Sequence, residues 1–222
     1  MNEVRIIEVK QSVFEDNHQD AQRLREQLKA EKTFLLNLMS SPGAGKTSTL
    51  LALAKELEGK LRWAVMEADI DSDVDARAMQ NAGVRSIQIH TGGMCHLDAD
   101  MTRQGLEALG TENVDLVVLE NVGNLVCPAE FDTGAVKNIP ILSVPEGDDK
   151  PLKYPLMYEV CDLLVINKTD VLSYFDFDLE KAKAAARKRN PQIEILCISA
   201  KTGEGIAELA AWMIRNATQW NQ

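Results

Sequence analysis

The most chemically informative segment of the chain is a glycine-rich turn between an apolar run and a helix-forming stretch. Ser40-Ser-Pro-Gly-Ala-Gly-Lys-Thr47 follows the run Phe34 to Met39. In this setting backbone N–H groups can surround a phosphate, a lysine can bridge phosphate oxygens and a hydroxyl can ligate Mg²⁺. Ser40 stands where the general motif has glycine. We predict a phosphate-binding loop formed by Gly43, Ala44, Gly45, Lys46, Thr47 and Ser48.

Two later polar segments also follow apolar runs and are candidates for reading a nucleotide base. Asn167-Lys168-Thr169-Asp170 resembles the guanine-specificity motif of GTPases, and Ser199-Ala200-Lys201 resembles their fifth motif. The Asp170 carboxylate can accept hydrogen bonds from two adjacent guanine donors, a pair that adenine lacks. The resemblance implies that Lys168 lies along the base and that the Ala200 N–H meets the guanine carbonyl oxygen. We therefore expect GTP and GDP as ligands.

Acidic residues near the ends of two other runs are candidates for holding Mg²⁺. Glu120-Asn-Val-Gly123 resembles the third GTPase motif, with glutamate where many families have aspartate. The resemblance implies that Glu120 holds Mg²⁺ and that the Gly123 N–H reaches the γ-phosphate. No glutamine follows Gly123 in the position that many GTPases use to orient water. We therefore expect slow intrinsic hydrolysis.

Between Asp69 and Asp75 every second residue is acidic. A calcium-binding EF-hand is excluded, because its sixth and twelfth positions would be Val74 and Gln80 rather than glycine and glutamate. Asp69 and Asp75 are predicted to join Thr47 and Glu120 around Mg²⁺, whereas Asp71 and Asp73 are expected to be only solvated. The predicted catalytic residues are Lys46, Thr47, Asp75 and Glu120.

Soft metal ligands occur in two further segments, Cys95-His96 and Cys127-Pro128. A single cysteine is more often a small buried hydrophobe than a ligand. Adjacent side chains on a regular strand point to opposite faces, but Gly92-Gly93 permits an irregular backbone just before Cys95. Cys95, His96 and Cys127 can then share Ni²⁺ or Zn²⁺, with a position left open or completed by a second subunit.

The remaining pattern predicts an α/β fold, a single P-loop NTPase domain with a mostly parallel seven-stranded sheet covered by helices on both faces. Residues 33–222 form this domain, and residues 1–32 are expected to be an N-terminal helical arm that is exposed or faces a partner. The predicted strands are Phe34 to Met39, Trp63 to Met66, Ser86 to Ile89, Leu116 to Leu119, Ile141 to Val144, Leu163 to Ile166 and Ile193 to Ile198.

Composition narrows the possible partners and location. The formal net charge of -10 disfavours a nucleic-acid surface. No apolar run approaches the ~18 residues of a membrane helix, and residues 1–10 lack the core of a signal peptide. We expect a soluble, cytoplasmic protein without membrane contact. Its four dispersed cysteines are expected to be reduced, with Cys161 and Cys197 in the core.

Three segments together resemble the HypB-type nickel-insertion GTPases: Gly92-Gly-Met-Cys-His-Leu-Asp98, Glu120-Asn-Val-Gly-Asn-Leu-Val-Cys-Pro128 and Glu146-Gly-Asp-Asp-Lys150. The resemblance implies a GTPase that gates nickel delivery during maturation of [NiFe]-hydrogenase. It further implies a homodimer with Cys95, His96 and Cys127 at its interface, and as partners a HypA-type nickel metallochaperone and the hydrogenase large subunit. The Cys-rich and His-rich N-terminal stretches of some members are absent before residue 40.

Three other functions are also compatible with parts of this pattern. The first is a related urease-type nickel chaperone or cobalamin-enzyme GTPase chaperone. The second is a metal-storage or regulatory module in which hydrolysis is vestigial, although Lys46, Thr47, Glu120 and Asp170 are all present. The third is a P-loop kinase for a small molecule, which would not need Asn167-Lys-Thr-Asp170.

Overall fold

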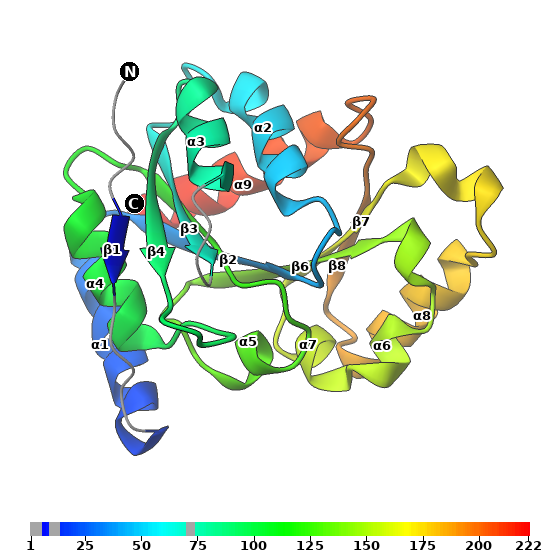
Figure 1. Cartoon of the computed structure of the whole chain (residues 1–222), viewed down its shortest axis with the longest axis horizontal. Helices are drawn as coiled ribbons and strands as arrows, with labels where there is room; N and C mark the ends of the chain where they lie inside the picture. The colour runs from blue at the N-terminus through cyan, green and yellow to red at the C-terminus, as the bar shows by residue number, and fades with distance from the viewer. Residues whose placement is uncertain (1–5, 9–13, 70–73) are drawn as a thin grey trace.

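The computed structural model describes residues 6–8, 14–69 and 74–222, which build a parallel sheet between two layers of helices (Figure 1). The strand order is β1-β4-β3-β5-β2-β6-β7-β8, and every neighbouring pair is parallel. The strands are β1 (Ile6–Glu8), β2 (Phe34–Ser40), β3 (Trp63–Asp69), β4 (Arg85–His90), β5 (Leu116–Glu120), β6 (Lys137–Ser143), β7 (Leu163–Asn167) and β8 (Glu194–Cys197). The seven predicted strands are confirmed as β2 to β8. The structure adds β1 at the edge, beside β4.

The helices lie on both faces of the sheet, as the continuous apolar strands predicted (Figure 1). They are α1 (Phe14–Glu31), α2 (Lys46–Leu57), α3 (Val74–Asn81), α4 (Ala99–Leu109), α5 (Cys127–Glu130), α6 (Lys150–Lys153), α7 (Pro155–Glu159), α8 (Leu179–Arg189) and α9 (Ile206–Asn221), with short 3-10 turns at Val144–Glu146 and Thr169–Tyr174. Helices α2, α3 and α9 contribute to the hydrophobic cluster on one face. Helices α1, α4, α7 and α8 contribute to the clusters on the other face.

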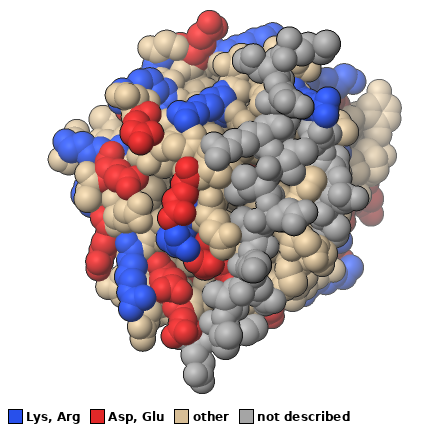
Figure 2. Space-filling model, turned by 60° about the vertical axis from the view of Figure 1, so that its left-hand side comes forward, with Lys and Arg blue, Asp and Glu red and all other residues tan. Residues whose placement is uncertain are grey.

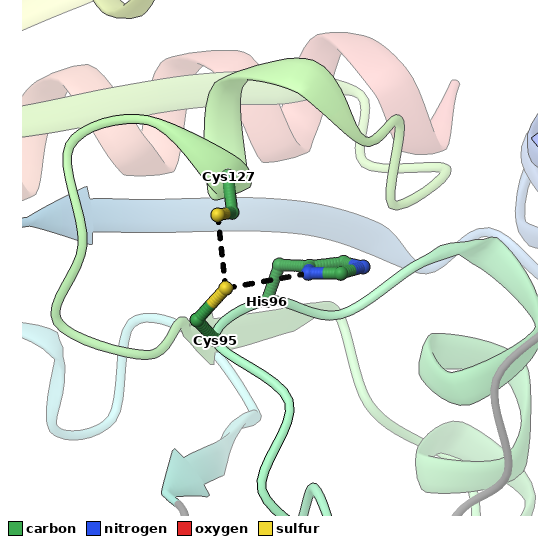
Figure 3. Close-up of side chains that lie close together, drawn as sticks. All are labelled: Cys95, His96 and Cys127. Carbon is green, nitrogen blue, oxygen red and sulfur yellow. Dashed lines mark hydrogen bonds between the residues drawn. The ribbon is translucent and has the colours of Figure 1, made fainter.

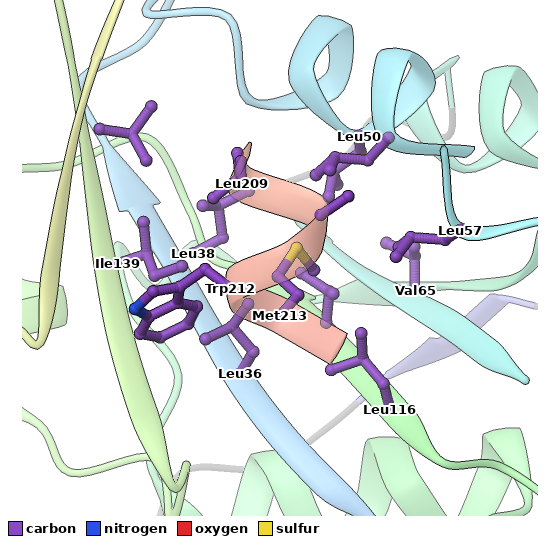
Figure 4. Close-up of a cluster of buried hydrophobic side chains, with 14 of the residues drawn as sticks. Leu36, Leu38, Leu50, Leu57, Val65, Leu116, Ile139, Leu209, Trp212 and Met213 are labelled. Atoms are coloured by element: carbon purple, nitrogen blue, oxygen red, sulfur yellow. The ribbon is translucent and has the colours of Figure 1, made fainter. Parts of the chain in front are cut away.

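The first hydrophobic cluster packs helix α9 against the central strands, whose ends carry the candidate sites. Leu209, Trp212 and Met213 of α9 pack toward Leu36 and Leu38 of β2 (Figure 4). Full burial of each large apolar side chain contributes about 1.5–3 kcal/mol. Because the strands are parallel, their carboxyl ends meet at one edge of the sheet, where the loops after β2, β3, β5, β7 and β8 carry the predicted site residues.

Helix α1 is helical as predicted, but the structure corrects the expectation that it is an exposed or partner-facing arm. Its thin apolar stripe is buried, with Ala21 and Leu28 both 0% exposed and Leu24 in the same cluster as Leu106 of α4. A thin stripe sufficed because one side of α1 packs on α4 and on β2, a strand in the interior of the sheet. The helix is therefore part of the packed domain.

On the face drawn in Figure 2, acidic and basic side chains of the described residues are interspersed. Within residues 6–8, 14–69 and 74–222, the helices are too short or too polar to cross a bilayer.

Candidate nucleotide and metal sites

The glycine-rich turn has the backbone that a phosphate-binding loop requires. Gly43 and Gly45 adopt left-handed conformations with φ of 75° and 99°. A Cβ atom on Gly45 would lie 2.6 Å from Asn167 Nδ2, so only glycine fits there without displacement. The turn ends at Lys46, where the 12-residue helix α2 begins and directs its free N–H groups toward the loop.

The predicted base-reading segment is joined directly to this loop. Asn167 Nδ2 donates to the Ala44 carbonyl at 3.0 Å, and Lys168 Nζ donates to the Gly43 carbonyl at 2.7 Å. Lys168 itself has a left-handed backbone with φ 64°. Residues far apart in the sequence therefore lie side by side at the carboxyl edge of the sheet.

Asp170 is held in place by the segment after β8. Ser199 Oγ donates to Asp170 Oδ1 at 2.7 Å and accepts from the Thr202 N–H at 3.1 Å. A cavity of about 890 Å³ is lined by predicted nucleotide-binding residues of three separate segments. These residues are Gly45, Ser48, Asn167, Lys168, Asp170, Ala200 and Lys201.

One detail of the predicted base site differs from the structure. The Ala200 N–H, expected to meet the guanine carbonyl oxygen, donates instead to Asn167 Oδ1 at 3.2 Å. Asn167 Oδ1 also accepts from the Lys168 N–H at 2.7 Å. The amide oxygen thus competes for the donor that was assigned to the base, and the base would have to share it.

A second cavity of about 580 Å³ continues the first along the phosphate loop. It brings together the residues predicted for phosphate and Mg²⁺: Gly43, Lys46, Thr47, Asp69, Asp75, Glu120 and Gly123. Thr47 Oγ1 donates to Glu120 Oε1 at 3.1 Å, and Lys46 Nζ lies 4.0 Å from the same oxygen. Asp71 and Asp73 lie outside the described residues.

The donor set at this second cavity suits Mg²⁺. Thr47, Asp69, Asp75 and Glu120 offer only hard oxygen atoms, the ligands that this cation prefers. Glu120 is 3% exposed, and with the neighbouring Glu67 carboxyl group ionised its buried Oε2 atom has no hydrogen-bond partner among the described residues. An orphaned carboxylate oxygen beside a phosphate loop fits a cation and its water ligands better than an empty apolar site.

Two carboxylates near this cavity were not predicted from the sequence. Glu67 of β3 is paired in register with Glu120 of the neighbouring strand β5. Burial, together with the charge of Glu120, raises the pKa of Glu67. Glu146 accepts from Ser41 Oγ and, at 2.7 Å, from the Ser143 N–H, and so links the phosphate loop to the end of β6. The signal for Glu67 was available, since a charged residue directly follows the predicted strand Trp63 to Met66.

The predicted soft-metal ligands converge from two loops (Figure 3). Cys95 and His96 lie between β4 and α4, and Cys127 is the first residue of α5. The ligand atoms of all three lie within 4.8 Å of one another, with Cys95 Sγ 2.9 Å from Cys127 Sγ and 3.9 Å from His96 Nδ1. Gly92 and Gly93 both have positive φ, which supplies the irregular backbone predicted there.

Cys95, His96 and Cys127 are called the metal cluster below, and the chemistry of these three side chains fits a single divalent cation. The His96 ring is 3% exposed and stacks on Phe131 at 3.5 Å, and its burial lowers the pKa, so the imidazole is neutral near pH 7. Its Nε2 atom has no partner among the described residues. The hydrogen bond with Cys95 raises the pKa of Cys127, so a metal must displace thiol protons. Tetrahedral metal–thiolate geometry would separate the two sulfur atoms to ~3.8 Å.

A short segment connects the metal cluster to the phosphate loop. Gly123 lies against Pro42, because a Cβ atom on Gly123 would be 3.0 to 3.1 Å from three Pro42 atoms. Asn124 Oδ1 accepts from the Val126 N–H at 2.8 Å, and Asn124 Nδ2 donates to Cys127 Sγ at 3.5 Å. The segment from Glu120 to Cys127 thus contacts both sites, and Asn124 fixes its turn.

Helix α1 ties together the two loops that carry the metal ligands. Asn17 Oδ1 accepts from the Ala99 N–H at 2.9 Å, just after the Cys95-His96 loop. Asn17 Nδ2 donates to the Asp132 carbonyl at 3.0 Å, just after α5. Arg25 Nε donates to the Ala135 carbonyl at 2.9 Å in the same segment. Sequence reasoning missed Asn17, since nothing in its local pattern marks it.

We expect Asn17→Ala to destabilise the domain and weaken metal binding together. The substitution leaves the Ala99 N–H and the Asp132 carbonyl without their partner, which costs about 1–3 kcal/mol of unfolding free energy for each buried group. Urea unfolding and Zn²⁺ titration against a chromophoric chelator measure the two effects. Gln22→Ala, on the exposed side of α1, is the matched control. An unchanged Zn²⁺ affinity in Asn17→Ala would show that α1 does not position the metal loops.

Comparison with known proteins identifies the family of the chain. The family described as CobW/HypB/UreG, nucleotide-binding domain, matches residues 34–197. The hydrogenase maturation factor HypB of Azotobacter vinelandii is 46% identical over 216 residues, covering 97% of this chain and 71% of that protein. HypB of Escherichia coli (strain K12) is 43% identical over 213 residues, covering 96% and 73%.

Solved structures show the same relationship. HypB from Helicobacter pylori in complex with nickel superposes with a TM-score of 0.87 at 36% identity, covering 93% of this chain and 97% of that one. The hydrogenase maturation factor HypB from Archaeoglobus fulgidus gives a TM-score of 0.85 at 34% identity, covering 92% and 100%. The chain belongs to the CobW/HypB/UreG family of nucleotide-binding proteins and, within it, to the HypB hydrogenase maturation factors.

Proposed function

We propose that this protein hydrolyses GTP and uses the nucleotide state to gate nickel delivery during maturation of [NiFe]-hydrogenase. The observation that carries this proposal is the segment from Glu120 to Cys127. Its first residue lines the phosphate cavity, Gly123 contacts the phosphate loop, and its last residue belongs to the metal cluster. The names of the HypB relatives and the nickel complex of the Helicobacter pylori protein support the same function.

Hydrolysis is assigned to residues of the second cavity. Lys46 holds phosphate oxygens, and Thr47 and Glu120, with Asp69 and Asp75 nearby, would hold Mg²⁺. When bound, Mg²⁺ neutralises charge that develops on the phosphate oxygens. In this structure the Lys46 ammonium is 4.0 Å from Glu120 and 3.3 Å from Ser40 Oγ, so the lysine is already directed into the phosphate site. Gly123 supplies a backbone N–H at the same cavity.

The metal cluster is the proposed binding site for the nickel ion that the protein delivers. Two thiolates and one neutral imidazole form a three-ligand set, which leaves room for a further ligand from a second subunit or from a receiving protein. A homodimer joined at this cluster would give each metal additional ligands. We further propose a HypA-type metallochaperone and the hydrogenase large subunit as exchange partners. The same ligand set accepts Zn²⁺, so the order of affinities must be measured.

Nucleotide state should alter metal affinity because of the connecting segment. If the Gly123 N–H bonds the γ-phosphate in the GTP state, its release after hydrolysis shifts Gly123 relative to Pro42. Only three residues separate Gly123 from Cys127, and Asn124 braces that turn. Metal–thiolate distances tolerate a few tenths of an ångström, so a small shift of Cys127 changes metal affinity.

We expect Ni²⁺ affinity to differ between the GDP complex and a complex with a non-hydrolysable GTP analogue by about 1–3 kcal/mol. Calorimetric titrations in both nucleotide states measure this difference, and light scattering follows dimerisation in the same samples. Cys127→Ala should abolish high-affinity Ni²⁺ binding in either state, whereas Cys161→Ala, a buried cysteine outside the cluster, should retain the parent's nucleotide dependence. Equal Ni²⁺ affinities in both states would contradict the gating function.

The other functions considered from the sequence receive less support. A urease-type or cobalamin-enzyme chaperone is not favoured, because relatives at 43–46% identity over nearly the whole chain are hydrogenase maturation factors. A storage module would bind metal without hydrolysing GTP, which a phosphate-release assay tests directly. A small-molecule kinase would not need the Asp170 site beside the phosphate loop.

A further inference from the structure

Beside the phosphate cavity lies a small chamber in which two buried polar side chains, Glu67 and Gln88, have no proposed role yet. It has a volume of about 40 Å³, and its lining also includes Lys46, Asp69, Asp75 and Glu120 of the proposed phosphate and Mg²⁺ site. This volume suffices for a single water molecule, which requires polar partners to remain there. Glu67, Gln88 and Glu120 come from the adjacent strands β3, β4 and β5, so the chamber is built into the rigid sheet.

With both carboxyl groups ionised, three oxygen atoms at this chamber have no hydrogen-bond donor among the described residues: Glu67 Oε1, Gln88 Oε1 and Glu120 Oε2. The Glu67 and Glu120 side chains lie within hydrogen-bonding reach of each other, so a proton on Glu67 is shared with Glu120, which leaves Gln88 Oε1 without a donor. Their side chains are at most 3% exposed, so bulk water does not satisfy them. The Gln88 amide cannot be turned around to help, because its Nε2 donates to the backbone carbonyls of Glu67 at 3.0 Å and Ile89 at 3.4 Å. Buried acceptors of this kind require a donor or a cation.

The charges at the chamber also indicate that a donor or a cation is needed there. Glu67 and Glu120 are register partners on β3 and β5, and the described cation at the chamber is Lys46, 4.0 Å from Glu120 Oε1. Two carboxylates buried side by side are costly unless positive charge or strong donors balance them. Mg²⁺ retains several water ligands when bound to protein, and these polarised waters are strong donors to nearby carboxylates.

We propose that Glu67, assisted by Gln88, positions a water of the Mg²⁺ hydration sphere and thereby sets the affinity of the nucleotide site for the divalent cation. This inference rests on the proposed function, since it takes Thr47 and Glu120 as the residues that hold Mg²⁺. Glu67 is a positioning residue in this arrangement. It acts through the water and through its contact with Glu120, while the nucleotide is held by other residues.

The test uses Mn²⁺, another hard octahedral cation, as a spectroscopic probe of the GDP complex. Electron paramagnetic resonance titration of Mn²⁺ into the full chain with GDP reports binding without any turnover. We expect Glu67→Gln to lower Mn²⁺ affinity at least fivefold, and Gln88→Met to lower it less. GDP affinity measured in EDTA should equal that of the parent. Glu26→Gln, an exposed carboxylate on α1, is the matched control and should bind Mn²⁺ as the parent does.

Stability measurements separate positioning from a purely structural role. The amide introduced by Glu67→Gln would give Glu120 a hydrogen-bond donor, so the urea midpoint of this variant should equal or exceed that of the parent while cation affinity falls. A Mn²⁺ affinity less than fivefold below that of the parent overturns the inference. Failure of the parent itself to bind Mn²⁺ with GDP would instead refute the proposed nucleotide and cation site.

Discussion

Asp170→Asn is expected to weaken GTP binding by about 2 kcal/mol or more and to make xanthosine triphosphate the better ligand. Asp170 lines the larger cavity, and the Ser199 hydroxyl donates to Asp170 Oδ1 at 2.7 Å. That bond fixes the carboxylate orientation and leaves the other oxygen for the base. With asparagine, an amide donor would face the guanine donors, whereas xanthine presents a carbonyl oxygen at the corresponding position.

Competition between fluorescent GDP and unlabelled GTP, ATP and xanthosine nucleotides measures this change. Asp176→Asn provides the matched control, because Asp176 is an exposed carboxylate in the loop after the same 3-10 turn. Retention of the parent's GTP affinity in Asp170→Asn would refute the assignment of the base site. Loss of all nucleotides equally would indicate that Asp170 supports the Ser199 segment rather than reading the base.

The arrangement of the candidate nucleotide site could be predicted from the sequence for two reasons. The phosphate loop is contiguous, and the conformational demands on Gly43 and Gly45 follow from a tight turn into α2. Parallel strands bring their carboxyl ends to one edge, so the sequence alone predicts that Asn167 and Ser199 lie near that loop. The metal cluster was predictable in the same way, as residues of two loops at that edge.

The features that were missed depend on register and on packing between distant segments. Glu67 is a candidate site residue because it is paired with Glu120 between strands β3 and β5. Local composition does not specify this register. Asn17 acts through bonds to partners that lie 82 and 115 positions away in the chain. Strand β6 begins at Lys137, before the predicted start at Ile141, and it includes Pro140, which pairs with Met39. A proline is unusual in the interior of a sheet, and the apolar pattern alone does not reveal this exception.

The exposed-arm interpretation of α1 failed for a related reason. Helix-spaced apolar residues reveal a stripe but not the surface that covers it, and a thin stripe also suits a helix that packs between a neighbouring helix and a sheet. Ala21 and Leu28 are fully buried against α4 and the core. The bonds of Asn17 then connect this packing to the loops that carry the metal ligands.

Lys46→Ala is expected to lower GTP hydrolysis by about 10²- to 10³-fold, the usual effect of removing one charged donor from a transition state. The Lys46 side chain is only 11% exposed, with its ammonium directed at Ser40 Oγ and Glu120. Its loss removes positive charge where charge develops on the phosphate. Phosphate release under single-turnover conditions at saturating GTP measures the rate, and Lys60→Ala, an exposed lysine after α2, is the control.

The same variant should still bind Zn²⁺ or Ni²⁺ at the metal cluster with an affinity near that of the GDP-bound parent. The ligands Cys95, His96 and Cys127 lie in loops held by α1, so their positions do not depend on Lys46. Hydrolysis and metal binding would then be chemically separable, and only their coupling through Gly123 would be lost. A Lys46→Ala protein that still turns over GTP at the parent's rate would show that the loop is not the catalytic phosphate site. Loss of metal binding with an intact fold would show that the two sites share more than the segment from Glu120 to Cys127.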